Sequence, residues 1–461
     1  MSGGGKLLVM LTEALRTRVF LEGGILRGIA GRSPLPVVAL WGHADGLLDK
    51  QIERFPNVKF VTLEEVMARK KLTRFQKLLA EADFQADRRF GFFPLAIRFN
   101  IKYGFNTDRL KPDHGNSFYD INRIGPAPRT ELFYNLMYKW SFSGFRFFHP
   151  SIKSFLREEN ITAAVVNNSQ TPLIHPFAYT AKKLGVKLVN YVASWDHPVS
   201  KGLFATYYDM YLVQNEMMKD ALVNLHGVAE KKIVITGWPQ MDHYGNSGTT
   251  MDYTALLKKW GLDSSKSCVL LAGNSETNAP YEPSLFKRLL DWRDANGGEN
   301  LFSIVLRPHP NDYRKKDGGR FTFLEGRKGV YIQQNSLSDI DELAALLRNA
   351  ACVVCTGGTV LLDSLANNRP VVGVMYDEGA PEGFSAAIKN FTMSHYGELV
   401  ESGAFYRANN FDEVISGLQN SLDNPAELAD KRAAITKRFV GELDGGAARR
   451  VVDAIIGAIE N

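Results

Sequence analysis

The feature that most constrains the fold is a strand, turn, helix and strand pattern between residues 350 and 377. An apolar run from Ala350 to Val354 leads into Thr356-Gly357-Gly358-Thr359, and a second apolar run, Val371 to Met375, follows a helical segment. Short apolar runs joined by a helix are typical of a parallel sheet covered on both faces. Free backbone N–H groups converge where the helix starts, and glycine admits close approach, so this turn is a candidate phosphate-binding site.

Two further strands are expected to end at the same edge of that sheet. The run Phe302 to Leu306 leads into Arg307-Pro308-His309-Pro310, which supplies a cation and an imidazole. The run Cys268 to Leu271 is followed by Asn274, Ser275 and Glu276. Together with the glycine turn, these residues predict a nucleotide-diphosphate site. Its candidate residues are Asn274, Ser275, Arg307, His309, Thr356, Gly357, Gly358 and Thr359.

The same alternation of apolar runs and helical segments extends over most of the 461 residues, which are too many for one core. It predicts an α/β protein with two doubly wound, Rossmann-like domains. The first covers residues 1–245 with an insert at about 65–150, the second covers 252–440, and a helix within 441–461 is expected to pack back on the first. Further expected strands are Leu7–Leu11, Pro36–Trp41, Val58–Val61, Ala163–Val166, Lys187–Val192, Met210–Val213, Lys232–Thr236 and Val330–Ile332.

The insert is rich in basic and aromatic side chains, and two interpretations stay open. Its rings can form a core of their own beneath solvated lysines and arginines, or residues 69–150 can rest on an anionic membrane surface. We favour the core, because aromatic rings are buried more often than not. No recognised nucleic-acid-binding motif is present, so no nucleic-acid partner is expected.

Composition sets further limits. The net charge of +5 is small for this length, and three cysteines are too few for a disulfide framework. Cys352-Val-Val-Cys355 lies in an expected strand, where residues three apart point to opposite faces, so it is not taken as a redox motif. No secretory signal opens the chain, and no apolar stretch reaches the roughly 18 residues of a membrane span. We therefore expect a cytoplasmic location.

The two domains and the anion-binding turn together resemble the GT-B glycosyltransferase architecture. The segment from Gly357 to Pro370, with Asp363 inside it, is similar to the S-S-x-x-x-D…K-P segment of CDP-glycerol glycerophosphotransferases and to the S-G-G-x-x-E-E…K-P segment of UDP-N-acetylglucosamine 2-epimerases. Arg307 to Pro310 resembles the R-x-H-P element of those enzymes and of bacterial GT-B sialyltransferases. Segments similar to surface-polysaccharide transferases of this fold are Ser194–Asp196, Asp209–Glu216, Thr236–Asp242 and Asp444–Arg450.

The resemblance implies roles for several residues. It assigns ribose binding to Asp363, phosphate binding to the glycine turn, and contact with the departing phosphate to Arg307 and His309. Structural roles also stay open for these positions. His309 can be a structural histidine and Asp363 a polar helix residue, and Thr356 and Thr359 can cap the helix. The epimerases carry paired glutamates where this chain has Leu362-Asp363, which argues against epimerisation.

The base that deprotonates the acceptor is expected in the first domain. Asp196, next to His197, is the first choice, and Glu13 and Glu22 are its rivals. Asp339-Ile-Asp341 spells the D-x-D of metal-dependent transferases of another fold, but it opens an expected helix, where capping explains it. No metal or other cofactor is expected beside the nucleotide co-substrate.

The sequence thus predicts a metal-independent, inverting GT-B glycosyltransferase. It would move a sugar from a nucleotide-sugar donor to a bacterial surface glycan or a lipid-linked precursor in the cytoplasm. Peripheral contact at the inner membrane face through residues 69–150 is the open alternative to an insert with a core of its own. Two alternatives remain. One is a glycerophosphotransferase of the CDP-glycerol type, and the other is a catalytically inactive GT-B scaffold that binds a glycan or a partner enzyme.

Overall fold

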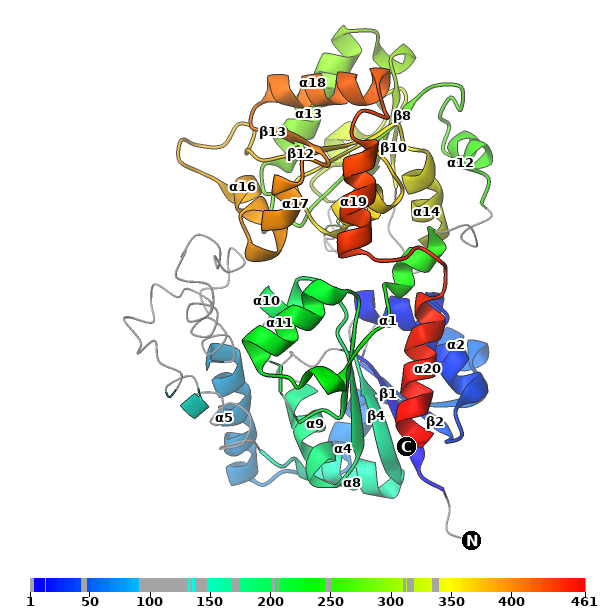
Figure 1. The fold of residues 1–461 in the computed structure, drawn as a ribbon, viewed down its shortest axis with the longest axis vertical. Coiled ribbons are helices and arrows are strands. Elements are labelled where there is room, and N and C mark those ends of the chain that lie inside the picture. Colours follow the sequence, from blue (N-terminus) through cyan, green and yellow to red (C-terminus); the bar gives the residue numbers. More distant parts are fainter. Residues whose placement is uncertain are drawn as a thin grey trace. The chain divides into compact units, whose positions relative to one another are not determined.

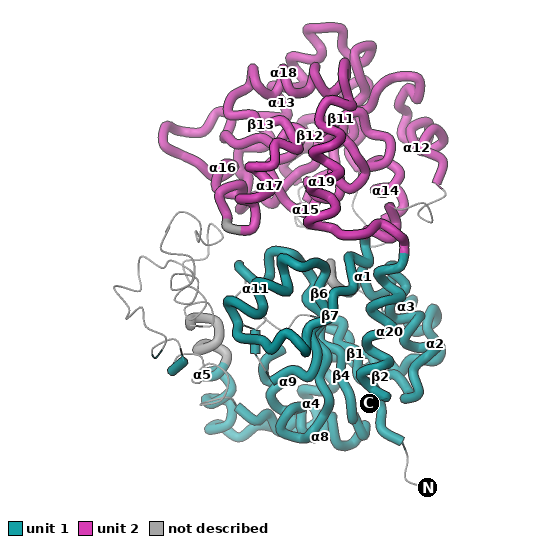
Figure 2. The backbone as a smooth tube through the Cα atoms, in the orientation of Figure 1, with its two compact units in different colours: residues 1–107, 118–240, 446–461 teal, residues 108–117, 241–445 magenta. Residues whose placement is uncertain are grey.

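Two compact units make up the chain (Figure 2). Unit 1 contains the described residues up to Gln240 together with Gly446–Glu460, and unit 2 contains Met241–Gly445. Figure 1 shows the fold as a computed structural model. The structure describes residues 4–12, 14–42, 48–90, 132, 135–136, 147–167, 174–200, 204–205, 207–244, 251–309, 312, 319–333 and 340–460.

Unit 1 is built on a parallel sheet whose described strands run in the order β3-β2-β1-β4-β5-β6-β7. The first strand, β1, therefore lies inside the sheet. Successive strands are added on one side of it up to β3 and on the other side from β4 onward. All five residues of β2 are buried, as expected for a strand covered on both faces. The strands are β1 (Lys6–Leu11), β2 (Val37–Trp41), β3 (Val58–Thr62), β4 (Ile161–Val166), β5 (Lys187–Tyr191), β6 (Met210–Val213) and β7 (Ile233–Ile235).

Helices cover both faces of this sheet, and local sequence sets several of their ends. Thr62 and Glu65 form a capping box at the start of α4, and Asn215 caps α11, which ends at the left-handed Gly227. The described helices are α1 (Ala14–Glu22), α2 (Ile25–Arg32), α3 (Leu48–Arg54), α4 (Leu63–Ala68), α5 (Arg74–Phe90), α8 (Pro150–Glu158), α9 (Ile174–Lys183), α10 (His197–Ser200), α11 (Glu216–His226) and α20 (Ala447–Glu460).

The last helix, α20, packs on unit 1, as the sequence predicted. Val451, Val452, Ile455 and Ile456 are buried in the same apolar core as residues of β1 and α2. Gly28 on α2 allows this approach, because a Cβ there would lie 2.8 Å from a methyl group of Val452. The chain therefore returns to unit 1 after completing unit 2.

Unit 2 repeats the architecture with described strands in the order β10-β9-β8-β11-β12-β13, all parallel. Its strands are β8 (Cys268–Ala272), β9 (Ser303–Arg307), β10 (Val330–Ile332), β11 (Cys352–Cys355), β12 (Val371–Val374) and β13 (Tyr406–Ala408). Its described helices are α12 (Tyr253–Lys259), α13 (Glu282–Ala295), α14 (Ile340–Asn349), α15 (Thr359–Ala366), α16 (Ala386–Phe391), α17 (Gly397–Glu401), α18 (Phe411–Asp423) and α19 (Ala429–Phe439).

The α/β class and the two Rossmann-like sheets are confirmed, with strand ends within two residues of those expected. The sequence missed β13, a three-residue edge strand that is only partly buried. Cys352 and Cys355 are free and fully buried, and burial raises the pKa of each thiol to about 12, which does not suit redox chemistry. Most of the predicted insert, residues 65–150, lies outside the described residues.

Candidate functional site

Three loops of unit 2 meet at the carboxyl edge of its sheet because β8 pairs with both β9 and β11. The backbone N–H of Gly273, just after β8, donates to the carbonyl of Arg307 at 2.8 Å. A Cβ on Gly273 would lie 3.1 Å from Pro308 Cα and 3.4 Å from Glu282 Oε2. Glycine at this position therefore lets the loop after β9 lie directly against the loop after β8.

The glycine turn after β11 leaves the start of α15 open. Gly357 and Gly358 have φ angles of +102° and +91°, which residues with a side chain rarely adopt. Gly358 is the N-cap residue of α15, and as a glycine it supplies no capping side chain of its own. A Cβ at Gly358 would have no atom of the described residues within 4 Å. The turn therefore combines a helix amino terminus with room beside it, as binding of a phosphate requires.

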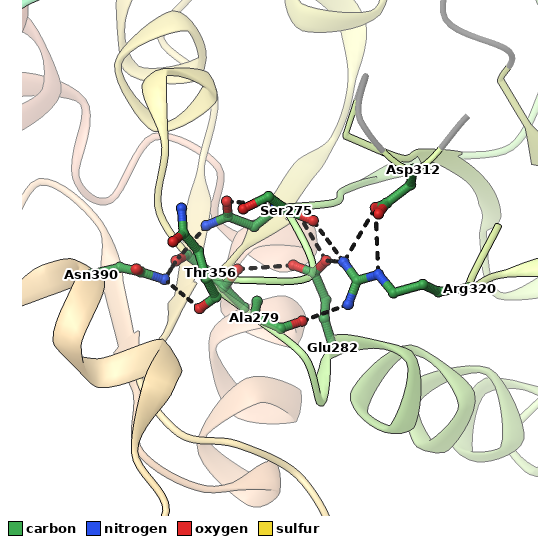
Figure 3. Close-up of polar contacts among 9 residues, drawn as sticks. Ser275, Ala279, Glu282, Asp312, Arg320, Thr356 and Asn390 are labelled. Atoms are coloured by element: carbon green, nitrogen blue, oxygen red, sulfur yellow. Dashed lines mark hydrogen bonds and ion pairs between the residues drawn. The ribbon is translucent and has the colours of Figure 1, made fainter. Parts of the chain in front are cut away.

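A buried carboxylate, Glu282 at the start of α13, holds the loops together (Figure 3). It accepts hydrogen bonds from the backbone N–H of Asn274 at 2.8 Å and from the hydroxyl of Thr356 at 2.9 Å. Its side chain is fully buried. Burial raises the pKa of Glu282 to about 8, against the opposing influence of Arg320 and these hydrogen bonds, so the carboxyl group is mainly protonated at neutral pH.

Arg320 closes the other side of this cluster (Figure 3). Its guanidinium donates to the carbonyls of Ala279 and Asn274 at 2.6 Å each, and it lies 3.3 Å from Asp312 and 3.4 Å from Glu282. A planar guanidinium can satisfy several acceptors at fixed angles. Arg320 thereby fixes the loop from Asn274 to Ala279 in one conformation.

The glycine turn is also held from α16. The side-chain amide of Asn390 donates to the carbonyl of Thr356 at 2.9 Å and to that of Asn278 at 3.1 Å. The amide of Asn274 donates to the same Thr356 carbonyl at 3.4 Å. On the far side of the turn, the backbone N–H of Gly358 donates to the hydroxyl of Tyr396 at 2.6 Å. The loop after β8 and the turn after β11 thus form one hydrogen-bonded unit.

The other residues predicted to bind the nucleotide donor lie at this edge but differ in burial and contacts. Arg307 is 9% exposed, and its Nη1 donates to Gln333 Oε1 at 2.6 Å. His309 is half-buried, and burial lowers its pKa despite the nearby Asp312, so the imidazole is neutral at neutral pH. Asp363, in the second turn of α15, is 6% exposed.

The two predicted threonines do not cap α15. The hydroxyl of Thr356 binds Glu282, Thr359 is the first residue of the helix, and the cap position belongs to Gly358. Thr356 therefore shapes the turn, because its buried hydroxyl is directed at Glu282 and away from the helix start. Ser275 contributes its backbone N–H to Asn274 Oδ1 at 2.8 Å.

The candidate bases belong to unit 1. Asp196 follows β5 and accepts a hydrogen bond from the hydroxyl of Ser194. Glu22 forms a two-pronged ion pair with Arg54, with N–O distances of 2.6 and 3.1 Å, which favours a structural role for this carboxylate. Glu13 lies outside the described residues. Asp196 thus keeps its place as the first candidate.

Metal binding has no candidate cluster among the described residues, where no group of three or more histidine, cysteine or acidic side chains is suitably arranged. Of the D-x-D sequence, Asp341 is the second residue of α14, where a carboxylate favours the helix dipole but does not cap the helix, and Asp339 lies outside the described residues. None of the described helices is both long and apolar enough to span a bilayer.

Several residues that build the site carry no sequence signal of their own. Glu282 is separated from Thr356 by 74 residues, and Asn390 from Asn278 by 112, so only the fold brings them together. An acidic residue before Pro283 resembles an ordinary first-turn glutamate. Asn390 belongs to an Asn-Phe-Thr sequence, which has the form of a glycosylation signal, but it is only 4% exposed.

The fold is similar to that of several enzymes of known structure. The S. aureus MnaA–UDP complex has a TM-score of 0.56 at 11% identity, over 99% of this chain and 97% of that one. The Methanocaldococcus jannaschii UDP-GlcNAc 2-epimerase with UDP-GlcNAc and UDP has 0.55 at 16%, over 98% and 99%. The wall teichoic acid polymerase TagF has 0.53 at 12%, over 99% and 89%. At these identities the likeness shows the GT-B-like fold.

The family of the chain follows from its sequence. No individual curated protein matches it. Residues 147–457, more than half of the chain, match the family model of CDP-glycerol:poly(glycerophosphate) glycerophosphotransferase. This segment includes all the described residues of unit 2 and the site described above. The chain is therefore a transferase that belongs to the CDP-glycerol:poly(glycerophosphate) glycerophosphotransferase family.

Proposed function

We propose that the protein transfers glycerol phosphate from a CDP-glycerol-type donor to a hydroxyl group of a bacterial cell-surface polymer. The family match over residues 147–457 carries this choice of transferred group. The open start of α15 supports the choice of donor, because backbone N–H groups and the helix dipole favour a diphosphate there. The sequence had placed this activity second to sugar transfer, and the family match reverses that order.

In the proposed reaction, the acceptor hydroxyl oxygen attacks the phosphorus atom that carries glycerol. A new P–O bond forms, the bond between that phosphorus and the bridging oxygen breaks, and CMP leaves with the bond's electrons. The acceptor's proton passes to a base, for which Asp196 of unit 1 is our candidate. The acceptor would be a surface glycan or its lipid-linked precursor.

The residues of unit 2 have complementary proposed roles. Backbone N–H groups of Gly358 and Thr359 would hold the diphosphate once the Gly358 N–H is released from the Tyr396 hydroxyl, and Asp363 would hold the ribose. His309, neutral at working pH, would hydrogen-bond to the departing phosphate, and Arg307 would contribute positive charge from behind it. These roles require no metal, so we propose that the reaction is metal-independent. Glu282 and Arg320 would act as positioning residues, because their described contacts are to the loops.

Sugar transfer is the second candidate, because structural neighbours at the level of the fold were solved with UDP and UDP-GlcNAc. It breaks a different bond: the anomeric C–O bond, with inversion, so a nucleoside diphosphate leaves in place of CMP. A third reading, an inactive GT-B scaffold, predicts neither product. The proposed location is the cytoplasm, with the protein lying peripherally at the inner membrane face.

The leaving group tests the proposal directly. Purified protein is incubated with CDP-glycerol or with UDP-sugars, with and without a glycerol phosphate oligomer, and nucleotides are separated by chromatography. We expect oligomer-dependent release of CMP from CDP-glycerol, lost in Asp363→Ala and kept in Asp291→Ala, which alters an exposed aspartate of the same unit. Release of UDP from a UDP-sugar would favour sugar transfer, and no release from any donor would favour the scaffold.

A further inference from the structure

A buried glutamine binds Arg307, the predicted phosphate contact after β9. Gln333 directly follows β10 and is 1% exposed, and its Oε1 accepts a hydrogen bond from Arg307 Nη1 at 2.6 Å. The backbone N–H of Gln333 donates to the carbonyl of Leu306 at 2.8 Å, which continues the parallel pairing of β10 with β9 beyond the last residue of β10. The sheet therefore holds the glutamine and the arginine side by side at its carboxyl edge.

The orientation of the Gln333 amide is determined on both sides. Its Nε2 donates to Oε2 of Glu342, in the first turn of α14, at 3.0 Å. Since a guanidinium only donates hydrogen bonds and an ionised carboxylate only accepts them, the amide fits between the two in one orientation. Lys259 Nζ of α12 donates to the other carboxylate oxygen at 3.1 Å. These four side chains form a continuous chain of hydrogen bonds from the carboxyl edge of the sheet to the exposed Lys259.

The neutral amide keeps the carboxylate of this chain away from Arg307. A glutamate at position 333 would also accept the hydrogen bond from Nη1, but it would place a negative charge in contact with the guanidinium. The attraction between two charges falls with their separation, and it is stronger in a partly buried site than in water. A carboxylate in contact with Arg307 would therefore compete with a bound phosphate, whereas the Gln333 amide orients the guanidinium without adding charge. An apolar side chain at this position would not orient it.

We propose that Gln333 is a positioning residue for anion binding by Arg307. Arg307 is here the contact to the departing phosphate, so the role of Gln333 rests on the proposed function. Gln333 fixes the direction of the guanidinium, and Glu342 fixes the direction of the Gln333 amide. A side chain that is already ordered loses little conformational freedom when a ligand binds, so this chain of hydrogen bonds favours tight binding of a phosphate.

Exchanging the amide and the carboxylate separates a positioning role from a structural one. In Gln333→Glu/Glu342→Gln, the carboxylate at position 333 can accept hydrogen bonds from Arg307 and from the amide at position 342, whose oxygen can accept one from Lys259. Each hydrogen bond of the chain can therefore re-form, and the total charge is unchanged. The difference is that the negative charge now lies in contact with Arg307.

The test is calorimetric titration of the full chain with CDP and with inorganic pyrophosphate, together with thermal unfolding. We expect the exchange variant to melt close to the wild type but to bind both ligands at least about tenfold more weakly. Gln333→Met, which keeps the length of the side chain but removes its amide, should bind them about three- to tenfold more weakly. The control Gln419→Glu makes the same chemical change at an exposed position of α18 and should bind both ligands as the wild type does.

Wild-type affinity in the exchange variant would overturn the proposal, because the chain of hydrogen bonds would then only stabilise the fold. If the exchange variant melts well below the wild type, Gln333→Met decides: unchanged affinity overturns the proposal, and weaker binding supports it. A wild type that binds neither ligand would also overturn it. Binding of CDP without release of CMP from CDP-glycerol would instead count against the proposed transfer and leave the role of Gln333 intact.

Discussion

The carboxyl edges of the two sheets have the same topology, but they differ in whether their buried polar side chains have hydrogen-bond partners. In unit 2, Glu282, Arg320 and Asn390 bind one another's loops, so the polar groups of Thr356 and Asn274 are held in place. In unit 1, Asn167 after β4 is fully buried, yet neither atom of its side-chain amide has a partner among the described residues. Gln214 Oε1 after β6 and Trp238 Nε1 after β7 are also buried without a hydrogen-bond partner among the described residues.

This difference indicates how well each edge is ordered before a ligand binds. A fully satisfied buried network is rigid, so the edge of unit 2 is organised before anything binds. Unpaired buried polar atoms cost free energy, which a ligand or a rearranged loop recovers. In a doubly wound sheet the ligand crevice lies where the strand order reverses, which in unit 1 is between β1 and β4, and Asn167 directly follows β4.

The largest effect is expected from removing the carboxyl group at the centre of the unit 2 network. Glu282→Ala leaves the Thr356 hydroxyl and the Asn274 N–H without their buried acceptor, while Arg320 keeps Asp312 as an acidic partner, so unfolding in urea should show a loss of about 2–5 kcal/mol. Glu325→Ala, an exposed glutamate of the same unit, should change stability by less than about 0.5 kcal/mol. Equal effects of the two substitutions would mean that the network does not hold the edge together.

Next in size is a change of the glycine turn itself. Gly358→Ala forces a methyl group into a left-handed backbone position, which costs about 1–3 kcal/mol, and places it in the open space beside the start of α15. Gly326→Ala is the matched control, because Gly326 also has a positive φ of +77° and an open Cβ direction. Calorimetric titration with CDP should show binding lost in Gly358→Ala only. Loss in both variants, or in neither, would separate the turn from nucleotide binding.

Replacing one buried asparagine in each unit compares the two edges directly. Asn390→Leu removes two hydrogen bonds from the unit 2 network and should destabilise the protein by about 1–3 kcal/mol. Asn167→Leu removes no hydrogen bond to a described residue, so it should be neutral or slightly stabilising. Chemical denaturation of the two variants measures the difference. A large loss in Asn167→Leu would show that this amide is satisfied and that the contrast is wrong.

A dependence of stability on pH tests the protonation of Glu282 itself. The folded-state pKa of Glu282, about 8, lies above its unfolded value of 4.5, so the folded state holds a proton that the unfolded state releases. Stability from this group is complete below pH 4.5 and is lost as pH rises through 8, with a slope of at most about 1.4 kcal/mol per pH unit. Glu282→Gln should remove this slope between pH 5 and 8. An unchanged slope would assign it to other groups.

The sequence predicted the elements of the fold better than the contacts within the site. Apolar runs such as Val371–Val374 are local signals, whereas Tyr406–Ala408 is too short and too exposed to give one. Asn274, Thr356 and Gly358 were correctly placed at one edge, because parallel strands end together. The carboxyl group that joins them was missed, since its partners are distant in sequence. The direction of the Arg307 guanidinium, toward Gln333, also depends on a contact between separate loops.

We propose that the edge of unit 2 is a preformed site for a nucleotide diphosphate. It is tested most directly by thermal unfolding with UDP, GDP, CDP, CMP, ADP and dTDP, with wild type and Arg307→Ala compared side by side. A ligand at about 100 times its dissociation constant should add about 2.7 kcal/mol to the stability of the folded state. We expect cytidine nucleotides to raise the melting temperature of the wild type and to have little effect on Arg307→Ala. No shift with any nucleotide, or equal shifts in both proteins, would contradict the account.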